Sequence, residues 1–238
     1  MKNKVICIIP ARGGSKSIKL KNLQLLDKKP LIYYPINAAI KSGVCDKIIV
    51  STDNVKIANK AKLYGAEVPF LRNKKFSGDL ISTEETLKHA LFQAESFYNC
   101  KFDICVFLTC TNPFRKISWI KYAVNYLKKN NDYDSVFSVH NLYRHFWHIK
   151  KNNKPSKVLS WMKNYTSRQI APKLYREDTG LACATRAKFW RKGKRIGQKV
   201  HFIVNRDSIT GIDINNKMDL FLANSIIKYL KKKNIKYF

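Results

Sequence analysis

Residues 5–10 read V-I-C-I-I-P, and residues 11–16, which follow them, read A-R-G-G-S-K. The first six form an unbroken apolar run, which is typical of a strand buried on both faces of a parallel sheet. The next six change at once to glycines and cations. Because ligands bind to open α/β sheets beyond the carboxyl ends of the strands, these two segments predict both a buried sheet and the place of its ligand.

Apolar runs of the same kind recur along the chain. We predict further strands at residues 47–51, 104–108, 136–139, 181–184 and 201–204. Strands that alternate with helices imply helices on both faces of one sheet. The sequence therefore predicts an α/β fold with a Rossmann-like, three-layer, doubly wound sheet.

Helical patterns separate several of these strands. Asp53 is expected to cap a helix that runs to Tyr64, and Gly65 to end it. Ser82-x-x-Glu85 is a capping box, and apolar residues follow it at helical spacing. Two more amphipathic patterns lie at residues 117–127 and 222–230.

Residues 141–179 interrupt this alternation. They are rich in Lys, Asn, Arg and aromatic residues and show no long period. We interpret them as an arm or a lid inserted in a single domain that spans residues 1–238, with oligomerisation as one role for an arm.

The composition limits the classes of function. With 238 residues, 45% of them hydrophobic, the chain can bury a sizeable core. The net charge of +30 suits a nucleic-acid partner, but the lysines are scattered over the whole chain, which favours a solvated lysine-rich surface. Such a charge also attracts a nucleotide triphosphate or an acidic sugar. Because no segment reads as a signal peptide or a membrane span, we expect a cytoplasmic protein with no membrane partner.

The loop from Arg12 to Asn22 is the strongest local signal. Gly13 and Gly14 let backbone N–H groups approach a ligand, and Arg12, Lys16 and Lys21 supply charge for phosphates. The loop matches neither of the common glycine-rich nucleotide-binding motifs. It predicts an anion site, the alternative being a tight turn with solvated charges.

The segment I-I-P-A-R-G-G-S-K-x-I-x-L-K-N-L (8–23) resembles the signature loop of the acylneuraminate cytidylyltransferases, the CMP-sialic acid synthetase family. The resemblance continues in order over nearly the whole chain. It includes I-I-V-S-T-D (48–53), Y-G-A-E-V-P-F-L-R (64–72), T-x-P-F-R (111–115), R-Q-x-x-P-x-x-Y-R (168–176) and I-D-I-x-x-x-x-D-L (212–220).

This resemblance implies a nucleotidyltransferase sheet in a homodimer with swapped arms. It implies a reaction in which the anomeric hydroxyl of a sialic-acid-like nine-carbon keto sugar acid attacks the α-phosphate of CTP, and pyrophosphate leaves. Mg²⁺ would be the cofactor. One alternative is a cytidylyltransferase for an eight-carbon keto-deoxy sugar acid. Another, of a different class, is a basic nucleic-acid-binding or assembly protein on a degenerate nucleotidyltransferase scaffold; we expect no sequence-specific nucleic-acid binding.

The resemblance also implies the residues around the nucleotide. They are Arg12, Gly13, Gly14, Lys21, Asn22, Arg72 and Ser82. Arg72 is alternatively a surface cation, and Ser82 alternatively serves only to cap a helix.

The sugar side is implied in the same way. Its residues are Thr109, Thr111, Arg168, Gln169 and Tyr175, with Arg168 facing the sugar carboxylate. Tyr175 is alternatively a plain core aromatic residue. The chain departs from the family pattern on this side, with Ser17 in place of a usual glycine and Cys183 where tyrosine is frequent.

Asp213 is the expected catalytic residue, together with Lys21 and Arg12. A carboxylate after a strand and before the last helix is a hard oxygen ligand for Mg²⁺. In the family pattern I-D-I-D the second carboxylate would stand at position 215, where this chain has Asn215. The expected metal ligands are therefore Asp213 and Asn215, unless these residues only cap the last helix.

Overall fold

The secondary structure follows the predicted alternation of strands and helices. The computed structural model describes residues 3–164, 167 and 169–235. The strands are β1 (Val5–Pro10), β2 (Leu25–Leu26), β3 (Lys29–Pro30), β4 (Lys47–Ser51), β5 (Ile104–Phe107), β6 (Ser135–Leu142), β7 (Trp147–Ile149), β8 (Pro155–Lys157), β9 (Leu174–Glu177), β10 (Cys183–Arg186) and β11 (Val200–Asn205). The α-helices are α1 (Tyr33–Ser42), α2 (Val55–Leu63), α3 (Thr83–Phe97), α4 (Ile117–Lys129), α5 (Ala187–Arg191) and α6 (Lys217–Lys232).

The main sheet has the strand order β11-β6-β10-β5-β1-β4, and β9 pairs with β6 outside this path. β1 runs parallel to β4 and β5, and β6 runs parallel to β11. The exception is β10, which lies antiparallel between β5 and β6 with Cys183 opposite Phe107. This reversal brings the turn before β10 to the edge at which β5 ends.

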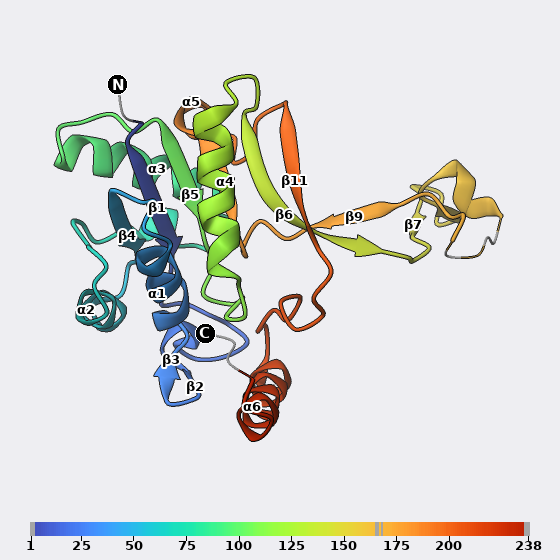
Figure 1. The fold of residues 1–238 in the computed structure, drawn as a ribbon, viewed down its shortest axis with the longest axis horizontal. Coiled ribbons are helices and arrows are strands. Elements are labelled where there is room, and N and C mark those ends of the chain that lie inside the picture. The colour runs from blue at the N-terminus through green and yellow to red at the C-terminus, as the bar shows by residue number, and fades with distance from the viewer. Residues whose placement is uncertain (1–2, 165–166, 168, 236–238) are drawn as a thin grey trace.

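Helices cover both faces of this sheet (Figure 1). The side chains of β1 alternate between the two faces: Val5, Cys7 and Ile9 pack in one apolar cluster with α1 and α4, whereas Ile6 and Ile8 pack in another with α3 and α5. All five are fully buried. The expected three-layer arrangement is therefore confirmed, with β1 buried between β5 and β4 in the middle layer.

Side-chain caps fix where three helices begin. The capping box of Ser82 and Glu85 starts α3, as predicted, and Asn216 forms a second one with Asp219 at the start of α6. The prediction that Asp53 caps α2 is wrong, because Asn54 accepts the hydrogen bonds of the first turn. Among the helices of the described ranges, none is long and apolar enough to cross a membrane.

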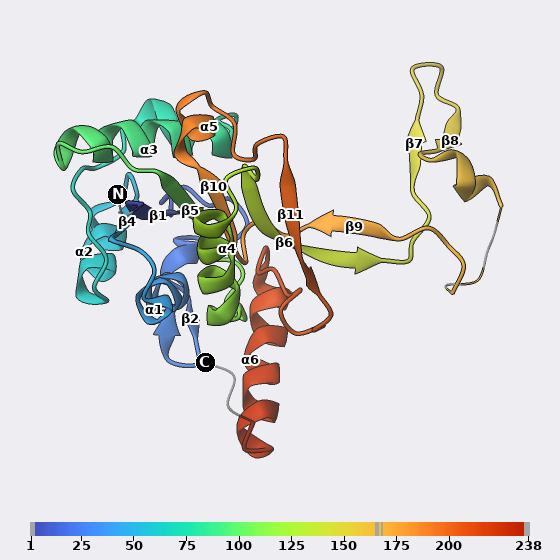
Figure 2. The same cartoon turned by 45° about the horizontal axis from the view of Figure 1, so that its top comes forward.

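An arm extends away from the sheet between β6 and β9 (Figures 1 and 2). At its base the end of β6 pairs antiparallel with β9. Farther out, β7 and β8 form a separate hairpin. The arm falls within residues 141–179, where the sequence loses its periodicity.

The carboxylate of Glu95 connects three elements at the edge of the body. It is 4% exposed, and it accepts hydrogen bonds from Arg191 and Lys101 and from the backbone N–H of Phe102. Burial alone would raise the pKa of Glu95, but these donors outweigh it, and the pKa lies below its ordinary value of 4.5. A depressed pKa stabilises the fold above that value, and the contribution is lost as pH falls through the folded-state pKa.

We therefore expect Glu95→Gln to lower the free energy of unfolding at pH 7 by about 3 kcal/mol, since it leaves Arg191 without its partner. The loss should shrink as the pH approaches 4 or below. Urea denaturation across this pH range measures both effects, with Asp132→Asn, at an exposed position, as the control. Equal stability of Glu95→Gln and wild type at pH 7 would contradict this role.

Candidate active site

Two cavities lie side by side at the carboxyl ends of β1 and β5. The first, of about 340 Å³, is lined by Pro10, Arg12, Asn22 and Arg72, among others. The second, of about 370 Å³, is lined by residues that include Asp213. Both are lined by Thr83, Phe107, Thr109 and Thr111. The predicted edge of the sheet thus carries a two-part site in which one ligand could meet another.

The glycine loop packs against the turn between β4 and α2. The backbone N–H of Gly13 donates to Asp53 at 2.8 Å, and a Cβ on Gly13 would lie 2.9 Å from Asn54 atoms, which excludes any side chain there. A Cβ on Gly14 would meet nothing within 4 Å, so this backbone is open on one side. Asn22 donates from its side chain to the carbonyl of Arg12 at 3.0 Å, which is the supporting role expected of it.

Two cations of this loop converge on one carboxylate. Arg12 Nη1 lies 2.9 Å from Asp79 Oδ1, and Lys16 Nζ lies 2.7 Å from Asp79 Oδ2. The hydrogen bond from Lys16 lowers the pKa of Asp79, so this residue stays ionised at neutral pH. Asp79 also lines the first cavity. The position of the Asp79 carboxylate, between two cations, therefore suits an anion. The sequence analysis predicted an anion site at this loop.

Lys21 and Asp213 come close together although they lie at opposite ends of the chain. Burial lowers the pKa of Lys21, and the charge of Asp213 acts against that shift. The hydroxyl of Ser17 donates to the carbonyl of Asn215, so the glycine loop is bonded to the segment that carries Asp213. Lys21 is not among the residues that line the two cavities.

The segment from Asp213 to Asn216 is held at the second cavity by backbone contacts. The N–H of Ile214 donates to the carbonyl of Thr111 at 2.8 Å. The amide nitrogen of Asn215 donates to Asp213 Oδ2 at 2.9 Å. Asn215 therefore turns a donor, and not a ligand oxygen, toward Asp213. Across the described residues there is no group of three or more His, Cys, Asp or Glu that could hold a metal ion.

The structure separates the two alternatives that the sequence left open for Arg72 and for Ser82. Arg72 is 4% exposed, which contradicts a surface cation, and its Nε donates to Ser77 at 3.1 Å. It lines the first cavity, where burial lowers its pKa and the charge of Asp53 acts in the opposite direction. Ser82 caps α3 and lies outside the lining of both cavities, so its position favours the capping role over a nucleotide contact.

The buried guanidinium of Arg115 joins the loop after β5 to the turn before β10. It donates to the carbonyls of Thr109, Gly180 and Leu181. Burial lowers its pKa to about 10, which leaves it charged at neutral pH. Thr109 and Thr111, expected on the sugar side, are held by this arrangement at the boundary of the two cavities.

The remaining residues expected on the sugar side belong to the arm. Arg168 lies outside the described residues. Gln169 is exposed, and Tyr175 is 38% exposed with its ring 5.7 Å from that of Phe202, so Tyr175 is not a core residue. Neither Gln169 nor Tyr175 is among the described residues that line these two cavities.

Several charged residues of the second cavity escaped the sequence analysis. They are Arg176, Glu177, Asp178 and Arg195. The first three precede the antiparallel strand β10, whose direction the apolar pattern does not reveal. Arg195 lies in a loop with no recognisable motif.

Cations of a glycine loop and a carboxylate beside adjoining cavities, at one edge of an α/β sheet, form an arrangement that suits a nucleotidyltransferase. The family model described as "Cytidylyltransferase" matches residues 6–236, and the chain belongs to this family. It is 33% identical to the pseudaminic acid cytidylyltransferase of Campylobacter jejuni, covering 96% of this chain and 97% of that protein. It is 30% identical to the N-acylneuraminate cytidylyltransferase of Escherichia coli over 95% of this chain, which spans 52% of that protein.

A solved structure shares the fold. It is a CMP:2-keto-3-deoxy-manno-octonic acid synthetase complexed with CTP, with a TM-score of 0.70. The identity is 12%, and the match covers 95% of this chain and 99% of that one. The similarity confirms the nucleotidyltransferase type of sheet.

We expect Ser82→Ala to lower the free energy of unfolding by about 1 kcal/mol, because the first turn of α3 loses its cap. Ser82→Asp should retain the stability, since aspartate is an equally good cap. Thermal or urea denaturation measures both, together with the KM for the nucleotide. A KM that rises about tenfold in Ser82→Ala, with no loss of stability, would assign Ser82 to the nucleotide instead.

Proposed function

We propose that this protein transfers CMP from CTP to the anomeric hydroxyl of a sialic-acid-like nine-carbon keto sugar acid. The observation that carries the proposal is the pair of adjoining cavities, one beside the cations of the glycine loop and the other beside Asp213. The relatives named for N-acylneuraminic and pseudaminic acids support a substrate of this kind. The octonic acid synthetase, at 12% identity, supports the fold alone.

In the proposed reaction the hydroxyl oxygen of the sugar attacks the α-phosphorus of CTP, and the hydroxyl proton passes to solvent. The bond from the α-phosphorus to its bridging oxygen breaks, and pyrophosphate leaves with the electron pair. Arg12 and Lys16, which now share Asp79, would offset the charge that grows on the leaving group. The glycine loop would hold the phosphates in line with the sugar by its backbone N–H groups.

Mg²⁺ is the proposed cofactor. The Asp213 carboxylate suits a hard cation, and the lack of a complete cluster among the described residues suits an ion that phosphate oxygens help to hold. Bound by Asp213 and CTP, Mg²⁺ would neutralise phosphate charge. Asn215 would orient the Asp213 carboxylate through its 2.9 Å hydrogen bond, or ligate the ion after its amide turns over.

Pyrophosphate release tests the proposed function directly. The purified chain is incubated with Mg²⁺, with CTP, ATP, GTP or UTP, and with a panel of eight-carbon and nine-carbon keto sugar acids. We expect release with CTP and a nine-carbon acid. Equal release with another triphosphate would contradict the preference for CTP, and faster turnover of an eight-carbon acid would select the alternative substrate class.

Substitutions at the metal site give a second prediction. Asp213→Asn should remove most turnover, because the neutral amide holds a divalent cation less firmly. Asn215→Asp should lower the Mg²⁺ concentration at half-maximal rate, since it adds a negative charge beside Asp213. Magnesium titrations of the initial rate measure both. If Asn215→Asp leaves the magnesium dependence unchanged, position 215 does not belong to the metal site.

We also propose a homodimer in which the arm of each protomer reaches the site of its partner. The arm carries exposed apolar side chains, with Trp147 55%, Ile149 65% and Ile170 73% exposed. Apolar surface of this kind usually marks an interface. Gln169 and Tyr175, which the family resemblance places on the sugar side, are not among the described residues that line the two cavities, and exchange of arms would supply them to the other protomer.

Co-expression of two differently tagged variants, Arg168→Ala and Asp213→Asn, tests this exchange. Each alone should be nearly inactive. Random assembly makes about half of the dimers mixed, and each mixed dimer has one intact site of two, so about one quarter of wild-type activity should return. Mixed dimers isolated through both tags that show no more activity than the parents would contradict the exchange.

A further inference from the structure

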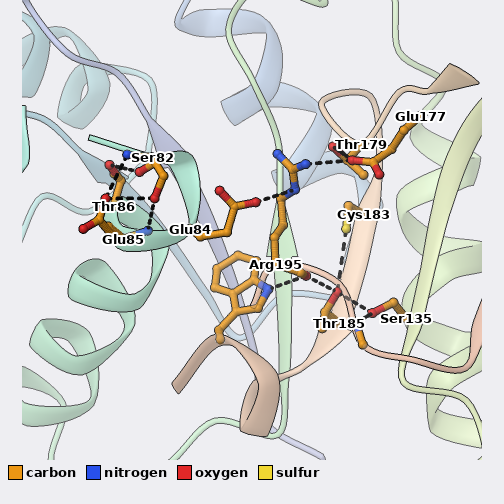
Figure 3. Close-up of polar contacts among 12 residues, drawn as sticks. Ser82, Glu84, Glu85, Thr86, Ser135, Glu177, Thr179, Cys183, Thr185 and Arg195 are labelled. Carbon is orange, nitrogen blue, oxygen red and sulfur yellow. Dashed lines mark hydrogen bonds and ion pairs between the residues drawn. The ribbon is translucent and has the colours of Figure 1, made fainter. Parts of the chain in front are cut away.

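Arg195 is a second-cavity residue with a firmly held backbone. It lies in the loop between α5 and β11, and its carbonyl accepts hydrogen bonds from the hydroxyl of Thr185 at 2.8 Å and from the indole N–H of Trp190 at 3.0 Å. Trp190 is fully buried. Figure 3 shows the Arg195 side chain directed from this anchor toward Glu177 and Glu84. The position of its guanidinium is therefore set before any ligand arrives.

The guanidinium has one buried donor that is not in use. Its Nη2 donates to Glu177 Oε1 at 2.7 Å, and its centre lies 5.7 Å from the ring of Phe107. Its Nε is buried and, among the residues that the structure describes, makes no hydrogen bond. Glu84 Oε1 is 3.6 Å from that Nε, which is an ion pair but too far for a hydrogen bond.

The two carboxylates beside Arg195 come from separate elements. Glu177 ends β9 at the base of the arm, and Glu84 lies in the first turn of α3, whose start is fixed by the capping box of Ser82 and Glu85. Arg195 thus joins the arm base, α3 and the loop before β11 (Figure 3). A donor and an acceptor, Arg195 and Glu177, stand side by side in the lining of the second cavity.

The charge of this cavity decides what kind of group fits there. Its lining holds two cations, Arg176 and Arg195, and three carboxylates, Glu177, Asp178 and Asp213. Arg176 is already paired with Asp178 through hydrogen bonds of 3.0 and 3.1 Å. A ligand carboxylate placed at Arg195 would face Glu177 and Glu84 at close range, and like charges repel. A neutral group that accepts from Arg195 and donates to Glu177 meets no such cost.

We infer that Arg195 is a specificity-determining residue that binds a neutral, hydrogen-bonding substituent of the sugar acid, either an acylamino group or a hydroxyl, with Glu177 as its partner. The inference rests on the proposed function, because it takes the second cavity as the sugar site. An apolar substituent at this place would form no hydrogen bond with Arg195 or Glu177, which is how a site built for hydrogen bonds rejects an analogue that lacks them.

The test uses the full chain, CTP, and the acid of the panel that it turns over best. Arg195→Met keeps the length of the side chain and removes the charge, and should raise the KM for the acid at least about tenfold, the loss of one charge-assisted hydrogen bond. The KM for CTP should stay within about twofold. Arg195→Lys should recover part of the loss. Lys194→Ala, an exposed neighbour in the same loop, is the matched control.

A deoxy series of the same acid identifies the substituent. In each analogue one acylamino group or hydroxyl is replaced by hydrogen. For the analogue that lacks the recognised group, Arg195→Met and the wild type should have equal kcat/KM, and Glu177→Gln should show the same pattern. The identity of that analogue shows whether Arg195 binds an acylamino group or a hydroxyl.

Two kinds of failure are distinguishable. If the wild type releases no pyrophosphate with any acid, the proposed function fails and the inference fails with it. If the wild type is active but Arg195→Met leaves the KM for the acid unchanged, or weakens CTP equally, only the inference is overturned, since Arg195 is then a structural residue. The inference is also overturned if no analogue removes the difference between Arg195→Met and the wild type.

Discussion

The buried guanidinium of Arg115 is the contact on which the architecture of the site depends. Its Nε and Nη2 donate to backbone carbonyls of the loop after β5 and of the turn before β10, whereas its buried Nη1 makes no hydrogen bond among the described residues. Leaving such a charge without acceptors is costly, so these carbonyls must converge on it. Their convergence places Thr109 beside Gly180, at the boundary of the two cavities. The division of the site into two parts follows from this one buried charge.

Much of the framework can be predicted from local chemistry. The apolar runs predicted the strands of the main sheet, because a strand covered on both faces has no polar alternation. The α1 helix was missed: its sequence Y-Y-P-I-N-A-A-I-K-S has Pro35 near its start and no side-chain cap before it. The error at Asp53 and Asn54 has a similar cause. Both are good caps, and only the tertiary hydrogen bond from Gly13 to Asp53 decides between them.

The residues of the candidate site also fall into a predicted group and a missed group. Arg12, Asn22 and Arg72 belong to segments with a recognisable pattern, and the structure places all three in the first cavity. Asp79 and Arg195 belong to loops without one, and they reach the site only through long-range packing. Most of the missed residues precede β10. Their place at the site depends on the direction of β10, and an apolar sequence does not show in which direction a strand runs. Hydrophobic periodicity shows which face of a strand is buried, but it does not show with which strand it pairs.

Two departures from the family pattern lie in contact. Ser17 stands where a glycine is usual and Asn215 where a second aspartate is usual, and the hydroxyl of Ser17 donates to the carbonyl of Asn215. The amide of Asn215 in turn donates to Asp213. The negative charge missing at position 215 is thus accompanied by a new bond between the glycine loop and the Asp213 segment. The Asp213 carboxylate is held by a hydrogen bond from a neutral amide and not by an ion pair, and salt screens such a bond less than it screens charge pairs at the surface.

In the proposed function, the carboxylate of Asp79 between Arg12 and Lys16 would make the entry of a nucleotide an exchange of anions. The cations are never bare, so an incoming phosphate gains only the difference between its own attraction and that of the aspartate it replaces. A ligand with one negative charge gains little binding energy when it replaces the aspartate. A triphosphate carries several negative charges, and each of them adds to the attraction. The same balance favours departure of a product that keeps a single phosphate, since the tethered carboxylate returns at no cost in translational entropy. The Asp79 carboxylate would thus compete with ligands for the two cations, and the affinity of a ligand would rise with its negative charge.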